Sequence, residues 1–198
     1  MIEGANKRPR LVLLCGLPGA GKTTIGRELA DAYGAVRLDN DEWKLALGIH
    51  PFDGDVGLRL ETQLLALTER LLTLGTSVIL EWGVWTRVER EGLRDMARSL
   101  GVAVELRFLD VPYEELVRRV VERTANGGIP ITADIMETSR GIFQPPTEEE
   151  LSLFDPPLVR AGREPDEPGY VGLDPEAGKE VTDRSNLEAS ASAGGDPS

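Results

Sequence analysis

The chain has 198 residues, of which 40% are hydrophobic and 28% charged, a composition typical of one globular domain with a single core. No apolar run approaches the roughly 20 residues that span a bilayer, and the N-terminal residues lack the apolar segment of a secretion signal. One cysteine and one histidine exclude an internal disulfide and a histidine metal centre, and the net charge of −12 disfavours a polynucleotide partner without excluding it. We therefore expect a cytoplasmic protein without a membrane segment, in which Cys15 is a small buried residue.

The first motif lies between an apolar run at residues 10–15, which predicts a buried strand, and residues 22–33, whose apolar spacing predicts a helix. The intervening GLPGAGKT fits G-x-x-x-x-G-K-[ST] at every fixed position. In this pattern glycines let backbone N–H groups converge on phosphate oxygens, Lys22 reaches the β and γ phosphates, and the Thr23 hydroxyl binds Mg²⁺. The flanking elements disfavour the alternative, a glycine-rich turn without a ligand. The predicted nucleotide-binding residues are Gly16, Leu17, Pro18, Gly19, Ala20, Gly21, Lys22, Thr23 and Thr24.

Acidic residues follow the second predicted strand, residues 35–38, at the sheet edge where open α/β sheets bind ligands. Asp41 is therefore a candidate base that orients and deprotonates an acceptor hydroxyl, and Asp39 is a candidate substrate contact. Asp and Asn are also preferred N-cap residues. The pattern equally fits a simple cap, formed by residues 39–41, of the helix that follows.

A loop is expected at residues 48–56, followed by a long helix with a leucine stripe that covers one face of the sheet. The stripe consists of Leu60, Leu64, Leu67, Leu71 and Leu74. Residues 76–80 predict a third strand that ends at Glu81, with two tryptophans in the loop beyond. Glu81 could hold a Mg²⁺-bound water or touch substrate, or it could be an exposed strand end. Trp82 and Trp85 could stack on a planar substrate group, or they could simply pack.

The next predicted elements are a helix around residues 93–100, a strand at 102–109 and a helix at 112–124. The last of these carries Arg119 and Arg123 four residues apart on one flank. Two neighbouring guanidinium groups suit a triphosphate, and the glycines after the helix would let this region close as a lid. The alternative is a solvated cationic face, with Glu115 paired to Arg119.

The alternation of strands and helices predicts one α/β domain, a three-layer sandwich with a parallel sheet covered by helices on both faces. Residues 1–9 are expected to be an N-terminal extension, residues 10–161 the domain, and residues 162–198 a mostly disordered acidic tail. Within the domain, the helix at 112–124 is the predicted helical lid, residues 133–143 predict a short helix, and Thr147 caps one last helix. A short edge strand at 169–173 is the alternative for part of the tail.

The chain resembles the kinase-type P-loop ATPases, a group that includes the kinase domain of phage-type polynucleotide 5′-hydroxyl kinase, zeta-toxin-like kinases and chloramphenicol phosphotransferase-like enzymes. The resemblance spans residues 10–155, and three segments carry it: GLPGAGKTT, DNDEWK, and DVPYEELVRRVVERTANGGIPITADIMETSRGIF. It implies the P-loop NTPase fold, Asp41 as the catalytic base, and Arg119 and Arg123 as lid arginines.

One position differs from the polynucleotide kinases, which carry an arginine directly before the catalytic aspartate where this chain has Asn40. A basic match remains at Lys44, which is a further candidate substrate contact. Members of the group phosphorylate very different hydroxyls, so the fold and the phosphate donor transfer better than the acceptor does.

Together, the residues and the resemblance predict an ATP- and Mg²⁺-dependent kinase that transfers the γ-phosphate to a hydroxyl of a small molecule. The predicted catalytic residues are Lys22, Asp41, Arg119 and Arg123, and the predicted substrate contacts are Asp39, Lys44, Glu81, Trp82 and Trp85. Two alternatives stay open: a polynucleotide 5′-hydroxyl kinase, and an ATP-binding switch or binding module that transfers nothing.

Overall fold

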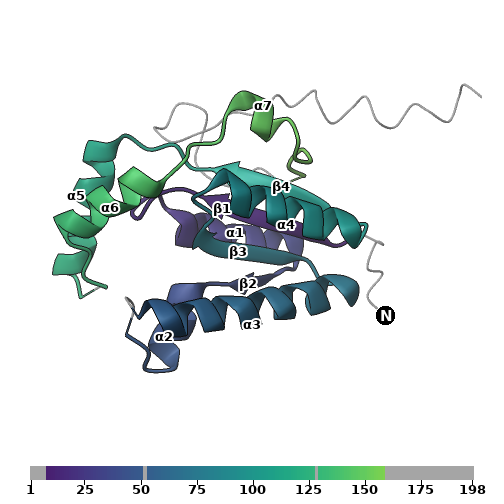
Figure 1. Ribbon diagram of the computed structural model, residues 1–198, viewed down its shortest axis with the longest axis horizontal. Helices are drawn as coiled ribbons and strands as arrows, with labels where there is room; N and C mark the ends of the chain where they lie inside the picture. Colours follow the sequence, from purple (N-terminus) through teal and green to yellow (C-terminus); the bar gives the residue numbers. More distant parts are fainter. Residues whose placement is uncertain (1–7, 51–52, 128, 159–198) are drawn as a thin grey trace, which may run out of the picture.

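The computed structural model describes residues 8–50, 53–127 and 129–158, and Figure 1 shows how their helices and strands are arranged. The possible strand at 169–173 and the acidic tail lie outside the described residues. The strands are β1 (Arg10–Cys15), β2 (Val36–Leu38), β3 (Val78–Gly83) and β4 (Ala103–Phe108). The helices are α1 (Lys22–Tyr33), α2 (Asn40–Ala46), α3 (Gly54–Thr73), α4 (Arg87–Ser99), α5 (Tyr113–Ala125), α6 (Ala133–Ile142) and α7 (Glu148–Leu151).

The sheet has the strand order β2-β3-β1-β4, and every pairing is parallel. In the central strand, Leu13 pairs with Leu80 on one side and with Leu106 on the other. All six residues of β1 are buried, as expected for a parallel strand that is covered on both faces. The carboxyl ends of β1, β2 and β3 therefore meet at one edge of the sheet. The phosphate loop follows β1, the acidic segment follows β2, and Glu81 lies near the end of β3.

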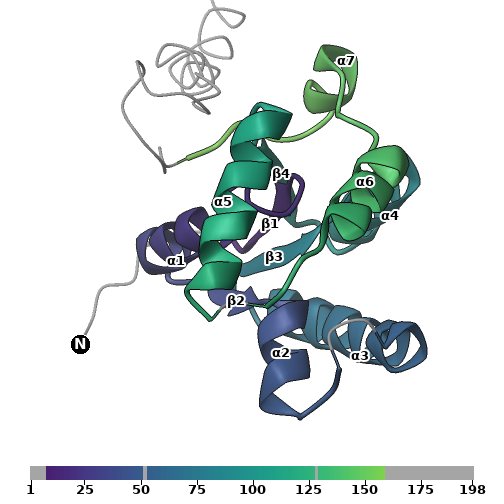
Figure 2. The same ribbon diagram turned by 90° about the vertical axis from the view of Figure 1, so that its left-hand side faces the viewer.

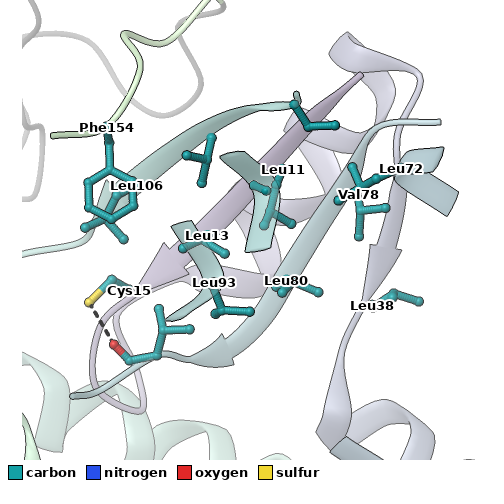
Figure 3. Packing of buried hydrophobic residues seen from close by; sticks show 14 of the residues in the cluster. Leu11, Leu13, Cys15, Leu38, Leu72, Val78, Leu80, Leu93, Leu106 and Phe154 are labelled. Atoms are coloured by element: carbon teal, nitrogen blue, oxygen red, sulfur yellow. Dashed lines mark hydrogen bonds between the residues drawn. The ribbon is translucent and has the colours of Figure 1, made fainter. Parts of the chain in front are cut away.

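Helices cover both faces of the sheet, as predicted for a three-layer α/β sandwich. Figure 2 shows α1 on one side of the strands and α3 and α4 on the other. On the α3 and α4 side, Leu11, Leu13 and Leu80 pack against Leu72 and Leu93 (Figure 3). On the α1 side, the packed residues are Val12, Leu14, Ile79 and Leu29. Among the described residues, no helix combines the length and apolarity needed to cross a membrane.

The Cys15 side chain is buried in this core, as expected from the sequence. Its thiol donates a hydrogen bond to the Val84 carbonyl at 3.6 Å, the dashed line in Figure 3. Burial raises the pKa of Cys15 to about 11, so the group stays a neutral thiol at physiological pH.

The structure corrects the boundaries of two predicted elements. Helix α3 begins at Gly54, inside the predicted loop, because the Asp53 side chain accepts a hydrogen bond from the Val56 N–H at 3.0 Å and caps the helix. The helix ends before Leu74, which is 64% exposed, so this residue is not part of the buried stripe. Strand β3 continues past Glu81 to Gly83, because Gly83 pairs with Cys15 after a shift in register.

Helices α5 and α6 stand at the end of the sheet that carries the phosphate loop (Figure 1). A separate apolar cluster joins them to that loop: Leu17, Ala20, Leu109, Leu116, Val120 and Met136. The two helices are also braced to each other, because the Arg140 guanidinium lies 4.5 Å from the ring centroid of Tyr113, whose hydroxyl donates to Glu137 at 2.6 Å. The predicted lid is therefore packed against the loop in this structure.

A buried ion pair ties the last described segment to the core. The Arg90 side chain on α4 is fully buried and binds both carboxylate oxygens of Glu150, at 2.5 and 2.9 Å. Its third nitrogen donates to the carbonyls of Val84 and Trp85, both at 3.1 Å. These four bonds use four of the five N–H donors of the guanidinium and fix the loop that follows β3.

Candidate active site

The phosphate loop connects β1 to α1 through glycines in backbone conformations that other residues rarely adopt. Gly19 has φ of 86° and Gly21 has φ of 94°, and Gly21 is the N-cap of α1. A Cβ atom at Gly19 would lie 2.9 Å from the carbonyl oxygen of Leu116 in α5. The loop thus depends on glycine both for its own shape and for its contact with the lid.

We expect Gly19→Ala to lower the free energy of unfolding by about 1–3 kcal/mol, because alanine at this φ is strained and its Cβ collides with α5. Urea unfolding followed by circular dichroism measures this loss. Gly92→Ala in α4 is the matched control, because a Cβ there meets nothing within 4 Å. Equal stability of the two variants would contradict the expectation.

Lys22 is the first residue of α1, and its ammonium group is folded back onto the loop. It donates to the carbonyls of Gly16 at 2.9 Å and Leu17 at 3.1 Å. Burial lowers the pKa of Lys22, and the charges of Glu81 and Asp41 act in the opposite direction. The residues predicted to bind the donor and to activate the acceptor thus lie within electrostatic reach of one ammonium group.

Asp39, rather than Asp41, caps helix α2. One carboxylate oxygen of Asp39 accepts from the backbone N–H groups of Asp41 at 2.9 Å and Glu42 at 3.2 Å. Asp41 lies in the first turn at the surface, and its carboxyl group is not used in the cap. Partial loss of hydration and the nearby charge of Asp39 raise the pKa of Asp41, a direction that suits a base in proton transfer.

Glu81 is not an exposed strand end, because only 5% of the residue is accessible. Its carboxylate accepts from the Arg37 guanidinium at 2.6 Å. Burial raises the pKa of Glu81, and the nearby Thr23 hydroxyl and Arg37 act in the opposite direction. Arg37 also donates to Asp39 at 3.1 Å and bonds to Glu42. Sequence reasoning missed Arg37, whose only signal is a basic residue inside a short strand that precedes an acidic segment.

Hard oxygen donors lie where the phosphate pattern places Mg²⁺. The described residues contain no group of three or more His, Cys, Asp or Glu side chains arranged to hold a metal ion. The Thr23 hydroxyl and the Glu81 carboxylate are hard oxygen donors, and they would fit a Mg²⁺ ion that completes its coordination with nucleotide phosphate and water. Thr23 would be a ligand and Glu81 would orient a bound water.

The two predicted tryptophans have structural contacts. Trp82 packs against the core cluster on the α3 and α4 side of the sheet. The Trp85 indole N–H donates to the Gly16 carbonyl at 3.3 Å, the same carbonyl that Lys22 binds. Trp82 is therefore a packing residue in this structure. Trp85 stabilises the start of the phosphate loop through its bond to Gly16.

The remaining candidates lie on either side of the loop. Lys44 extends across α3 at Gly57, where a Cβ would be 3.1 Å from its ammonium nitrogen. Arg119 pairs with Glu115 at 2.7 Å, the ion pair expected if this helix face is a solvated cationic surface. Arg119 also donates to the Gly19 carbonyl at 3.4 Å.

Arg123 is exposed one turn further along α5. Its positive charge acts to lower the pKa of both Lys22 and Asp41, as the smallest of the contributions to either group. Of the two predicted arginines, Arg119 is the one that contacts the phosphate loop, through the Gly19 carbonyl.

Comparisons with known proteins show what the chain is similar to. A protein family described as an AAA domain matches residues 11–146. A shikimate kinase from Corynebacterium glutamicum is 30% identical over 152 residues, which cover 73% of this chain and 84% of that protein. A second, from Corynebacterium jeikeium, is 35% identical over 116 residues and is covered over 58% of its length.

Solved structures share the fold. The Pnkp1/Rnl/Hen1 RNA repair complex matches with a TM-score of 0.60 and 23% identity, covering 69% of this chain and 44% of that one. A putative kinase from Chloroflexus aurantiacus matches with a TM-score of 0.57 and 22% identity, covering 71% and 83%. At these identities the structures establish the P-loop architecture alone. The chain therefore belongs to the AAA-domain family of P-loop kinases and is an ATP- and Mg²⁺-dependent phosphotransferase that acts on an alcohol group.

Proposed function

We propose that this chain transfers the γ-phosphate of ATP to a hydroxyl group of a small molecule, with Asp41 as the base. The observation that carries the proposal is the glycine-rich loop after β1 with the Lys22 ammonium folded onto its Gly16 and Leu17 carbonyls, at the sheet edge where β2 leads into the acidic first turn of α2. A phosphoryl transfer needs a phosphate cradle, a metal, a base and cations around the moving group. Each has a candidate side chain at this edge of the sheet.

In the proposed reaction, the acceptor hydroxyl loses its proton to Asp41 while its oxygen attacks the γ-phosphorus and the bond to the leaving ADP oxygen breaks. Lys22 exchanges its two carbonyl partners for phosphate oxygens, and Arg123 adds positive charge beside the transferred group. Bound Mg²⁺ would neutralise phosphate charge, with Thr23 and Glu81 as the residues that hold it.

The negative charge of the surface around Asp41 favours a small molecule over a polynucleotide as the phosphate acceptor. The first turns of α2 and α3 expose several carboxylates: Asp41, Glu42, Asp53 and Asp55. A nucleic-acid backbone approaching Asp41 would meet these four carboxylates and, on helix α2, the single cation Lys44. A neutral or cationic hydroxyl compound would not be repelled.

The test is phosphate transfer from γ-labelled ATP to a panel of sugars, polyols, amino alcohols and 5′-hydroxyl oligonucleotides, with Lys22→Ala protein as the blank. We expect labelled product with at least one small molecule. Labelling of oligonucleotides alone would replace this proposal with a 5′-hydroxyl kinase. Binding of MgATP without transfer to any hydroxyl on a broad panel would favour a binding module.

A further inference from the structure

One guanidinium group binds three carboxylates at the edge of the sheet. Arg37 on β2 donates to Glu81 at 2.6 Å and to Asp39 at 3.1 Å, and it also bonds to Glu42. The Arg37 side chain is only 14% exposed, and those of Glu81 and Asp39 are 2% and 9% exposed. Charge-assisted hydrogen bonds in such sheltered positions fix geometry more strongly than surface ion pairs do.

The partners of Arg37 serve both halves of the proposed reaction. Asp39 caps helix α2, whose first turn carries the proposed base Asp41. Glu81 lies beside Thr23, the proposed Mg²⁺ ligand. One nitrogen of Arg37 contacts both Asp39 and Glu81. This single side chain therefore fixes the distance between the start of the helix that carries Asp41 and the proposed Mg²⁺ site.

Helix α1 leaves room for this arrangement at a glycine. A Cβ atom at Gly26 would lie 2.7 Å from a carboxylate oxygen of Glu81 and 3.2 Å from the Arg37 side chain. Gly26 lies within the helix, where alanine is intrinsically better by roughly 1 kcal/mol. The glycine is therefore explained by the Arg37–Glu81 pair rather than by the backbone of α1.

We propose that Arg37 is a positioning residue that holds Glu81 beside the Mg²⁺ site and joins it to the helix that carries Asp41. This inference rests on the proposed function. Arg37 itself is turned toward protein carboxylates and acts through them.

The first test measures the dissociation constant of ADP by calorimetry with and without Mg²⁺. We expect Arg37→Met to reduce the Mg²⁺-dependent gain in ADP affinity by about 10-fold, the usual size for residues that orient metal ligands. Glu81→Gln should have a similar effect, and the double variant should be no worse than either single variant. Arg37→Lys should recover only part of the loss, because an ammonium lacks the planar fork.

Arg27→Met is the matched control, because Arg27 bonds to the exposed side of Glu42 at 3.3 Å and does not contact Glu81. Its Mg²⁺-dependent gain should equal that of the wild type. If Arg37→Met keeps or increases the gain, the positioning role is wrong, since removal of a positive charge alone would strengthen Mg²⁺ binding. If wild-type protein binds no MgADP, the proposed function itself fails.

The second test moves Glu81 without changing any charge. Gly26→Ala should reduce the same Mg²⁺-dependent gain by about 10-fold. Gly92→Ala, on the open surface of α4, should leave it unchanged. Unfolding curves of both variants establish that they are folded, so a normal Mg²⁺ response in folded Gly26→Ala protein would overturn the inference.

Discussion

Lys22→Ala is expected to lower kcat/KM for ATP by about 10³-fold, because the charge nearest the β and γ phosphates is removed from a preorganised site. Both the affinity for ATP and the turnover should fall. Product formation in a coupled ADP assay measures the loss, and Arg27→Met serves as the variant with an unrelated cation removed. Wild-type affinity and turnover in Lys22→Ala would contradict the assignment of the phosphate loop.

The loss should not come from unfolding. Burial lowers the pKa of Lys22 below its usual 10.5, so the folded protein binds this proton less tightly than the unfolded chain does. Stability contributed by this group therefore rises with pH between the lowered pKa and 10.5. Lys22→Met removes the buried charge, so its thermal midpoint near neutral pH should equal or exceed that of the wild type, and this rise with pH should disappear.

The second large effect is expected for Asp41→Asn, which removes the proposed base but keeps the size of the side chain. We expect kcat to fall by about 10³-fold, within the usual range for general base catalysis. The dissociation constant of MgATP should change little, since Asp41 acts on the acceptor. Asp31→Asn, at an exposed position of α1, is the matched control. Normal turnover in Asp41→Asn would remove the base assignment.

The pH profile gives an independent check. Partial loss of hydration and the neighbouring Asp39 raise the pKa of Asp41, so kcat should begin to fall at a pH above the usual aspartate value of about 3.9. A raised pKa means that ionised Asp41 is disfavoured in the fold, so its stability contribution is present at low pH and is lost as pH rises through the folded pKa. Asp41→Asn should therefore keep full thermal stability and lack this acid limb.

The sequence was sufficient wherever local chemistry determines structure. The phosphate loop was predicted because glycine spacing and apolar periodicity are local, and α1 begins at Lys22 and ends at Tyr33 as expected. The roles of Asp39 and Asp41 were not separable, because a cap and a base use the same residue types at the same spacing. Only the bonds from Asp39 to the N–H groups of α2 distinguish them.

Other features depend on contacts between distant residues and leave no periodic signal. Arg37 and Glu81 are 44 residues apart, and their pairing exists because β2 and β3 are neighbours in the sheet. The inference that Leu74 belongs to the buried stripe failed for a related reason. Its spacing was helical, but α3 ends at Thr73. Pattern alone gives the face of a helix and not the residue at which the helix ends.

The buried pair of Arg90 and Glu150 also defines how much chain the folding unit needs. The family match ends at residue 146, before Glu150 and before Phe154, which packs into the core. Asp155 binds both backbone groups of Val104, at 2.7 and 2.8 Å, and so closes part of the open edge of β4. A chain cut at the end of the family match would leave a buried arginine without its carboxylate and an edge strand without its cover. The contacts of the folded domain therefore extend past the family match at least through residue 155, and a chain cut at residue 146 should be less stable than the full chain.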